Sequence, residues 1–171
     1  MSTWPGLVAF APDHHRTDRF RCGVEQLDVW LRAYAGQSQR RDAARTFVVL
    51  EEDRVIAYCT LVASEIDHGG ATNEVRRGLS RHFPIPVCLL ARLAVDERHQ
   101  RTGLGRHVLR HALGRALQAA TEVGMRAVVV DALGGASGFY RRFGFAPVDA
   151  DGTTLMITVA HLAAVIGQTD G

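Results

Sequence analysis

The sequence predicts a single mixed α/β domain, residues 1–171, in which one β-sheet is flanked by helices. Two observations predict this fold class. The first half of the chain contains two apolar, β-branched runs joined by a four-residue polar turn, which is the pattern of a hairpin. The second half alternates strand-like and helical segments. A chain of 171 residues is long enough to fill one domain with a full core.

The first half is expected to contain a short strand, a helix, a hairpin and a polar segment with a short helix. The helix is predicted because Leu27, Leu31 and Tyr34 recur at spacings of three and four. Glycine-free β-branched runs on either side of the turn at residues 51–54 predict the hairpin. In order, the four segments cover residues 7–10, 21–41, 46–66 and 68–80.

The second half begins with a near-continuous apolar run, residues 87–95, which has the pattern of a strand buried on both faces. A polar loop follows, and residues 103–122 then form an amphipathic helix that Gly124 ends. The remaining elements are a buried strand, a short helix, a strand pair and a last helical turn. They are expected at residues 127–130, 136–143, from 145, 153–159 and 160–166.

Composition indicates an ordinary soluble globular protein with 47% hydrophobic and 22% charged residues. No apolar run approaches the roughly 18 to 20 residues that span a bilayer, and the first residues lack a signal-peptide pattern. A cytoplasmic protein is therefore expected. Cys22, Cys59 and Cys88 are odd in number and far apart, so neither a metal site nor a disulfide framework is predicted, and buried thiols are expected.

Charge is unevenly distributed along the chain, although the formal net charge is only +2. All 20 basic residues are arginine, and nine of them fall between Arg76 and Arg115 against two acids, Asp96 and Glu97. Arginine suits bidentate phosphate contacts, so the segment indicates a polyanionic ligand. Solvated helix faces are the alternative interpretation, and composition does not decide between the two.

The loop at residues 100–105, Gln-Arg-Thr-Gly-Leu-Gly, joins the buried strand to the long helix. Its two glycines permit close backbone approach, and the helix start offers unpaired N–H groups to a phosphate or pyrophosphate. A Walker A loop requires a lysine, which the chain lacks, and the dinucleotide fingerprint requires a third glycine where Val108 stands. Both of those phosphate-binding classes are excluded.

What remains, Gln-x-x-Gly-x-Gly after Leu93-Ala94-Val95, resembles motif A of the GNAT acetyltransferases. Residues 136–145 resemble the family's A-x-x-F-Y-x-x-x-G-F segment, so the likeness covers roughly residues 45–160. It implies the GNAT fold, a twisted mixed sheet whose splayed fourth and fifth strands admit acetyl-CoA. The implied acetyl-CoA contacts are Leu93, Ala94 and Val95 beside the pantetheine arm, Gln100, Arg101, Thr102, Gly103, Leu104, Gly105 and Arg106 around the pyrophosphate, and Ser137 and Phe139.

The same likeness places Tyr140 beside the CoA sulfur. A phenol with a pKa near 10 stays protonated at neutral pH, so Tyr140 is the candidate acid for the departing thiolate. A backbone N–H near Val95 would polarise the thioester carbonyl. No general base stands out, because the three possible candidates, Asp131, Glu65 and Asp67, each fit a structural or surface role better. An α-amino group, with a pKa near 7.7 to 8.0, needs a base less than a lysine side chain does.

Residues 20–31 carry F-x-C-G-x-x-x-L-D-x-W-L, which resembles the GNAT toxins of toxin–antitoxin pairs. That resemblance implies acetylation of aminoacyl-tRNA, a block of translation, a ribbon-helix-helix antitoxin encoded nearby, and a homodimer. RNA would be read through phosphates and shape, for which arginines are suited. The candidate tRNA contacts, some of which could serve the 3′-phosphate of CoA instead, are Arg76, Arg77, Arg81, Arg92, Arg40 and Arg41.

Two other functions remain compatible with these patterns. One is a GNAT enzyme for a small amine, a drug or a protein N-terminus, although the arginine bias disfavours a cationic substrate. The other is a non-catalytic CoA-binding regulatory module, which retention of both the loop and Tyr140 disfavours. A ribbon-helix-helix reading frame next to the gene would favour the toxin.

Overall fold

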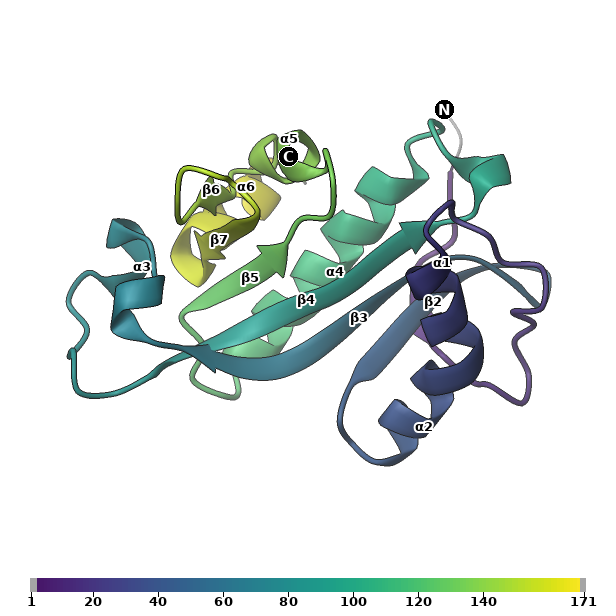
Figure 1. The fold of residues 1–171 in the computed structure, drawn as a ribbon, viewed down its shortest axis with the longest axis horizontal. Helices are drawn as coiled ribbons and strands as arrows, with labels where there is room; N and C mark the ends of the chain where they lie inside the picture. The colour runs from purple at the N-terminus through teal and green to yellow at the C-terminus, as the bar shows by residue number, and fades with distance from the viewer. Residues whose placement is uncertain (1–2, 170–171) are drawn as a thin grey trace. The chain divides into compact units, whose positions relative to one another are not determined.

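The computed structural model describes residues 3–169, and the outermost residues of the expected domain, 1–2 and 170–171, lie outside it (Figure 1). Seven strands form one sheet in the order β1-β2-β3-β4-β5-β7-β6. The sheet is mixed, because β4 and β5 pair in parallel whereas β1–β2, β2–β3, β5–β7 and β6–β7 are antiparallel. The predicted fold class, a mixed sheet flanked by helices, is confirmed.

The strands are β1 Val8–Ala9, β2 Arg45–Glu51, β3 Arg54–Ile66, β4 Ile85–Val95, β5 Ala127–Asp131, β6 Ala146–Pro147 and β7 Thr154–Thr158. The α-helices are α1 Glu25–Val29, α2 Ala35–Arg40, α3 Asn73–Arg76, α4 Leu104–Ala120, α5 Ser137–Arg141 and α6 Val159–Thr169. A π-helix, η1 Trp30–Tyr34, and two 3₁₀ turns, η2 His68–Gly70 and η3 Glu97–His99, complete the elements. Within residues 3–169 no helix combines the length and apolar character needed to cross a membrane.

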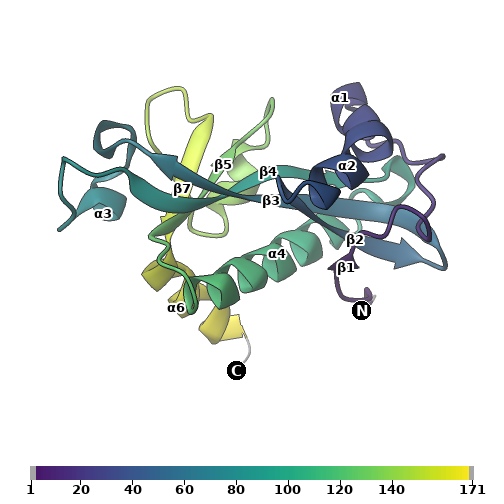
Figure 2. The same cartoon turned by 90° about the horizontal axis from the view of Figure 1, so that it is seen from below.

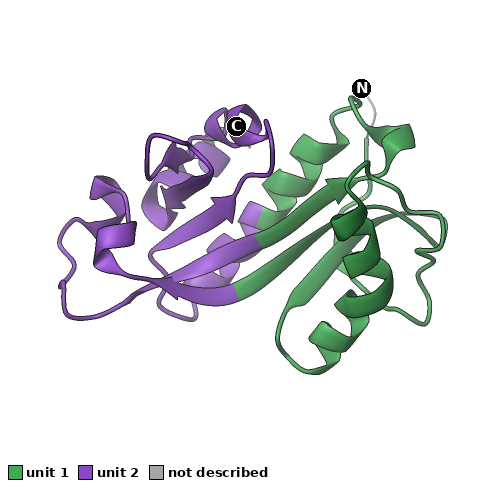
Figure 3. Ribbon diagram, in the orientation of Figure 1, with its two compact units in different colours: residues 1–62, 91–112 green, residues 63–90, 113–171 purple. Residues whose placement is uncertain are grey.

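The chain forms two compact units (Figure 3). Unit 1 contains residues 1–62 and 91–112, and unit 2 contains residues 63–90 and 113–171. Each unit is therefore built from two separate stretches of chain. Strands β3 and β4 and helix α4 contribute residues to both units.

Unit 1 is built on the predicted hairpin. Strands β2 and β3 pair from Arg45↔Leu61 to Glu51↔Arg54, with an irregularity at Val49 and Leu50. Helices α1 and α2 cover one face of these strands, and the first half of α4 lies on the other (Figure 2). The core of this unit is formed by buried apolar side chains from the N-terminal segment, the π-helix, α2 and strands β2, β3 and β4. Burying a large apolar side chain of this kind contributes about 1.5–3 kcal/mol. The core members are Phe10, Phe20, Leu31, Ala35, Val48, Val55, Tyr58 and Ala94.

The predicted helix at residues 21–41 is shorter than expected and is not uniform. It begins at Glu25, because the Asp28 carboxylate accepts a hydrogen bond from the Cys22 N–H at 2.9 Å and Gly23 adopts a φ of +95°, which together hold residues 22–24 in a turn. Its middle, Trp30–Tyr34, is a π-helix, a widened turn that is frequent at functional sites. Side-chain periodicity predicted the helix but not these two departures from it.

Unit 2 is built around β5, which pairs with β4 from Val87↔Ala127 to Leu90↔Val130 and with β7 from Ala127↔Thr158 to Asp131↔Thr154. Helices α3, α5 and α6 all contact β7. The core of this unit contains Ala71, Val75, Ile85, Val87, Ala127, Val129 and Met156. The final helix, α6, is longer than the helical turn predicted at residues 160–166. It runs from Val159 to Thr169, and Leu162 on this helix is buried.

Candidate functional site

Strand β4 continues beyond its ladder with β5. The β4–β5 pairing ends at Leu90↔Val130, whereas β4 extends to Val95. Leu93 and Val95 are half-buried, and Ala94 is buried in the core of unit 1. This stretch of extended backbone leads directly into the loop singled out by its glycines.

Asp96 turns the chain from β4 into that loop. Its side chain is only 5% exposed, and its oxygens accept hydrogen bonds from the N–H of Arg98 at 3.1 Å and of Arg21 at 3.2 Å. Its own N–H donates to the Ile56 carbonyl at 2.9 Å. A buried carboxylate is costly unless it is paired in this way, so these bonds fix where the loop begins.

The loop at residues 100–103 is braced from both sides. The side-chain amide of Gln100 donates to the carbonyls of Val95, at 2.9 Å, and Cys22, at 2.7 Å. The Thr102 hydroxyl donates to the His99 carbonyl. Gln100, predicted as a cofactor contact, thus has its amide group engaged in holding the loop against the end of β4.

Backbone conformation explains the glycine at position 103. Its φ is +89°, which strains any residue with a side chain, and Arg101 adopts a left-handed φ of +63°. A Cβ added at Gly103 would meet nothing within 4 Å among the described residues, so the space beside it is open. Helix α4 starts at the next residue, Leu104, which is fully buried.

The first turn of α4 offers N–H groups that have no carbonyl partner within the helix, and the positive end of this 17-residue helix lies beside an open, strained turn. This arrangement suits a phosphate or pyrophosphate group. Arg101 and Arg106 are exposed there and carry positive charge toward solvent. The residues present thus fit the pyrophosphate of CoA.

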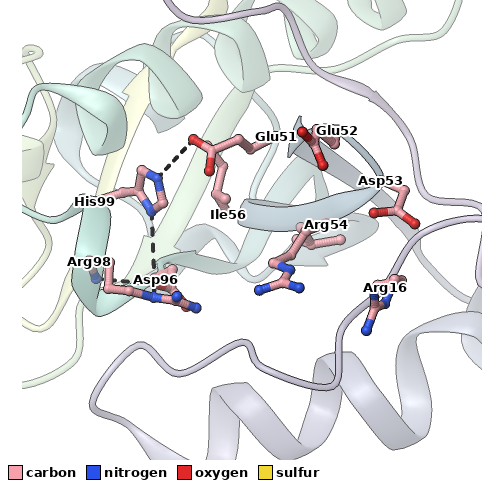
Figure 4. A pocket seen from close by; sticks show the side chains of 10 residues that line it. Arg16, Glu51, Glu52, Asp53, Arg54, Ile56, Asp96, Arg98 and His99 are labelled. Carbon is pink, nitrogen blue, oxygen red and sulfur yellow. Dashed lines mark hydrogen bonds and ion pairs between the residues drawn. The ribbon is translucent and has the colours of Figure 1, made fainter.

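His99 connects the loop to the β2–β3 turn (Figure 4). Its ring lies between two carboxylates, with Nε2 3.3 Å from Glu51 Oε2 and Nδ1 3.8 Å from Asp96 Oδ1. Among the described residues the buried Nδ1 has no hydrogen-bond partner, and Trp4 packs edge-on against the ring at 6.0 Å. A cavity of about 290 Å³ with charged walls lies alongside; it is lined by Arg16, Glu52, Asp53, Arg54, Asp96 and His99, among others.

Arg92 on β4 stacks on the π-helix. Its guanidinium carbon lies 4.0 Å from the centre of the Trp30 ring, and Trp30 stacks on Tyr58 with ring centres 6.2 Å apart. The Tyr58 hydroxyl donates to the Leu27 carbonyl at 2.7 Å. Burial raises the pKa of Tyr58. Burial also lowers the pKa of Arg92, and the charge interaction with Tyr58 partly offsets that lowering. Arg92, predicted as an RNA contact, therefore also has an internal aromatic partner.

The thiols differ in exposure. Cys59 and Cys88 are buried as expected, whereas Cys22 is only half-buried. Burial, reinforced by the hydrogen-bonded Asp28, raises the pKa of Cys22 to about 11, and burial alone raises that of Cys88 to about 11. All three are free cysteines, and in residues 3–169 no three His, Cys, Asp or Glu side chains are arranged so that they could hold a metal ion.

Tyr140 lies in unit 2 on the short helix α5 and is buried, with 6% of its surface exposed. Phe139 and Phe145 pack edge-on against its ring, with centres 5.1 Å and 5.8 Å away. The neighbouring Ser137 hydroxyl accepts a hydrogen bond from Arg141 Nε at 3.2 Å. The tyrosine ring is therefore held in one orientation.

The three carboxylates considered as bases are all exposed. Asp131 accepts a hydrogen bond from the Thr154 hydroxyl at 2.8 Å, while Glu65 is the last but one residue of β3 and Asp67 precedes η2. An exposed, solvated carboxylate is a weak base at neutral pH.

The arginines at the end of α3 are positioned by another arginine. Arg126 donates from Nε to the Val75 carbonyl at 2.8 Å, and from Nη2 to the carbonyls of Glu74 at 3.2 Å and Arg77 at 3.0 Å. These bonds satisfy the carbonyls that a helix end leaves free. Arg77 and Arg81 are exposed and Arg76 is half-buried.

The predicted site residues are divided between the units. Unit 1 holds residues 93–95, the loop to Arg106, and the exposed Arg40 and Arg41 at the end of α2. Unit 2 holds Ser137, Phe139 and Tyr140, together with the α3 arginines. Within unit 1 the strand end and the loop are brought together through Gln100.

Sequence reasoning missed Asp96, His99 and Arg126 as organising residues. Asp96 follows a buried strand and precedes a turn, which is a typical capping position and could have been recognised. The partners of His99 and Arg126 lie 48 and about 50 residues away in the chain, and periodicity cannot indicate contacts over that separation.

A family model described as an acetyltransferase (GNAT) domain matches residues 42–147, more than half of the chain, so the chain belongs to the GNAT acetyltransferase family. A curated tRNA-acetylating toxin from Mycobacterium tuberculosis is 39% identical over 150 residues, which cover 87% of this chain and 89% of the relative.

Solved structures share the same fold. The crystal structure of a tyrosine-to-phenylalanine mutant of KacT superimposes with a TM-score of 0.85 at 23% identity, over 94% of this chain and 99% of that one. Two structures of AtaT are 25% identical. The one bound to the C-terminus of the antitoxin AtaR has a TM-score of 0.80 and covers 95% and 96% of the two chains. The one bound with acetyl-CoA has a TM-score of 0.76 and covers 93% and 96%.

Proposed function

We propose that this chain transfers the acetyl group of acetyl-CoA to the α-amino group of aminoacyl-tRNA and thereby inhibits translation. The observation that carries the proposal is the 39% identity, over 87% of the chain, to a tRNA-acetylating toxin. Membership of the GNAT family and the likeness to AtaT bound with acetyl-CoA support the identity of the acetyl donor.

The proposed acetyl-CoA contacts are the end of β4 and the loop that follows it. Extended backbone at Leu93, Ala94 and Val95 offers hydrogen-bonding groups to the pantetheine amides in the manner of an added strand. The N–H groups at the start of α4 and the open turn at Gly103 suit the pyrophosphate. The residues assigned to this role are Leu93, Ala94, Val95, Gln100, Arg101, Thr102, Gly103, Leu104, Gly105 and Arg106, with Ser137 and Phe139 from α5.

We assign the acid role to Tyr140. Acetyl-CoA supplies the acetyl group as a thioester. When the substrate nitrogen bonds to the acetyl carbon, the carbon–sulfur bond breaks and the thiolate must take up a proton. A phenol is protonated at neutral pH and can donate that proton. The packing of Phe139 and Phe145 against the ring fixes the direction of its hydroxyl and supports this role.

The exposure of the three candidate bases supports an α-amino substrate. Asp131, Glu65 and Asp67 are all exposed. A lysine amine, with a pKa near 10.4, would need such a base, whereas roughly a fifth to a third of an α-amine with a pKa near 7.7 to 8.0 is already neutral at physiological pH.

The proposed partners follow from the same relatives. Arg76, Arg77, Arg81, Arg92, Arg40 and Arg41 are proposed to contact tRNA phosphates, because most of them are exposed cations. The AtaT structure with its antitoxin supports an antitoxin partner, which we propose to be a ribbon-helix-helix protein encoded nearby. We further propose that residues 1–171 act as one domain, as a cytoplasmic homodimer.

The test is transfer of labelled acetyl from acetyl-CoA to a charged, bulk aminoacyl-tRNA pool. Uncharged tRNA is the control, because it lacks the aminoacyl group that carries the α-amine. Label on charged tRNA alone supports the proposal. Binding of acetyl-CoA without any labelled tRNA would overturn it and would favour a small amine or a protein N-terminus as substrate.

A further inference from the structure

Unit 2 contains a hollow that is lined by none of the proposed acetyl-CoA contacts and not by Tyr140. It has a volume of about 630 Å³ and lies between η2 and the segment that leads into β4. Its walls include one aromatic ring, two arginines and two histidines against a single acid: Phe83, Arg76, Arg81, His68, His82 and Asp67.

Phe83 is the unusual member of this lining. Its side chain is 71% exposed, although burying a phenylalanine ring would contribute about 1.5–3 kcal/mol. Ile85, two residues further along the chain and the first residue of β4, is 1% exposed and belongs to the core of unit 2. The chain therefore anchors itself at Ile85 and leaves the aromatic ring of Phe83 in solvent beside cationic groups.

The surroundings of the ring are held in place before any ligand arrives. The Thr72 hydroxyl caps α3 by accepting a hydrogen bond from the Val75 N–H at 3.3 Å, and Arg126 binds three carbonyls at the other end of that helix. The Ser80 hydroxyl accepts a hydrogen bond from the His82 N–H at 3.1 Å. Pro84 restricts the backbone directly after Phe83. A rigid site loses less entropy when it binds.

We propose that this hollow binds an unpaired nucleotide of the single-stranded 3′ end of tRNA, with the base stacked on Phe83 and the adjoining phosphates on Arg76 and Arg81. An exposed aromatic ring flanked by arginines is the arrangement that proteins use for single-stranded nucleic acid. Paired bases are not accessible to such a ring, so an unpaired nucleotide is required. The inference rests on the proposed function, because the acetylated amine is attached to this end of the RNA.

The experiment uses an RNA hairpin that reproduces a tRNA acceptor stem with its unpaired 3′ end, in which 2-aminopurine replaces the unpaired purine next to the stem. Stacking on Phe83 quenches the fluorescence of this base. We expect quenching with the wild-type protein and with Phe83→Trp, which keeps an aromatic face. Phe83→Leu keeps apolar bulk without that face, so it should lose the quenching and weaken hairpin binding about 5- to 150-fold.

Two controls separate stacking from general damage. Val123 is 68% exposed and lies outside the lining of the hollow, so Val123→Ala should leave hairpin binding unchanged. A blunt hairpin without the unpaired end should bind wild-type protein and Phe83→Leu equally. Acetyl-CoA affinity should be the same in all variants, which verifies that they are folded.

The outcomes also separate this inference from the proposed function. Wild-type protein that acetylates aminoacyl-tRNA, combined with equal quenching in Phe83→Leu, would overturn the hollow as a nucleotide site and leave the proposed function standing. Wild-type protein that does not acetylate aminoacyl-tRNA would overturn the proposed function first. If Phe83→Leu alters only the oligomeric mass in solution, the hollow is an interface between copies of this chain and the inference is wrong.

Discussion

The guanidinium group of Arg92 lies 4.0 Å above the ring of Trp30, which joins β4 to the π-helix within unit 1. The position is notable because Arg92 falls in a strand that is otherwise apolar. A half-buried cation on such a strand is stable only with a partner, and the π face of Trp30 provides one. Because Trp30 also stacks on Tyr58, three side chains from three elements form one column.

The contribution of the Arg92–Trp30 contact to the free energy of unfolding can be measured. Arg92→Gln and Trp30→Leu should each destabilise the protein, and their effects should not add, because each removes the same contact. We expect a coupling of about 0.5–2 kcal/mol in a double-mutant cycle measured by urea unfolding. Purely additive effects would show that the contact contributes nothing to the free energy of unfolding.

Tyr140→Phe tests the assignment of the acid. The variant keeps the ring that packs against Phe139 and Phe145 and loses only the hydroxyl. Turnover should fall about 10²- to 10⁴-fold while acetyl-CoA affinity stays within about twofold. Tyr58→Phe is the matched control, since it removes a phenol bonded to the Leu27 carbonyl and should cost about 1 kcal/mol of stability without loss of turnover.

Gly103→Glu tests the phosphate loop. The new side chain would be strained at a φ of +89° and would bring a negative charge to the start of α4. Acetyl-CoA binding, measured by calorimetry, should be lost. Gly114→Glu adds the same side chain farther along α4, where a Cβ meets nothing within 4 Å, and should bind normally. Normal binding by Gly103→Glu would exclude this loop as the pyrophosphate site.

Arg126→Ala tests the support of α3. Three hydrogen bonds to the carbonyls of Glu74, Val75 and Arg77 would be lost, at a cost of about 1–3 kcal/mol. Hydrogen exchange of the amides between residues 73 and 79 should accelerate, while exchange in unit 1 should not change. Arg126→Lys, which can reach fewer carbonyls, should give an intermediate result.

The pH dependence of alkylation tests the environment of Cys22. Its pKa is raised from the usual 9.0 to about 11, so the neutral thiol is favoured in the folded protein and the reactive thiolate is scarce at pH 8. The rate of reaction with iodoacetamide should therefore keep rising about tenfold per pH unit up to pH 9.5. A rate that levels off near pH 9 would contradict this. Cys22→Ser identifies the reaction at this thiol.

The sequence predicted most elements of the sheet because buried strands leave continuous apolar runs. Strand β4 was expected at residues 87–95 and is found at Ile85–Val95, and β5 was expected at 127–130 and is found at Ala127–Asp131. The loop between β4 and α4 was also expected from its glycines, of which Gly103 adopts a positive φ whereas Gly105 lies within α4.

The remaining features depend on contacts between distant residues. The π-turn at Trp30–Tyr34 leaves the apolar spacing of the helix almost unchanged, so periodicity cannot reveal it. The clamp of Arg126 on α3 and the contact between His99 and Glu51 each join residues about 50 positions apart. An arginine or histidine in a sequence carries no sign of which distant carbonyl or carboxylate it will meet.

The discontinuous composition of the two units has a consequence for synthesis. Unit 1 requires residues 91–112, and unit 2 requires β7, which pairs with both β5 and β6. A nascent chain therefore cannot finish its first unit until about two thirds of it has left the ribosome, and it cannot finish the second until the last strand emerges. No translation product that ends before β7 would contain a complete set of strands. The activity proposed for this chain would thus appear only after its own synthesis is essentially over.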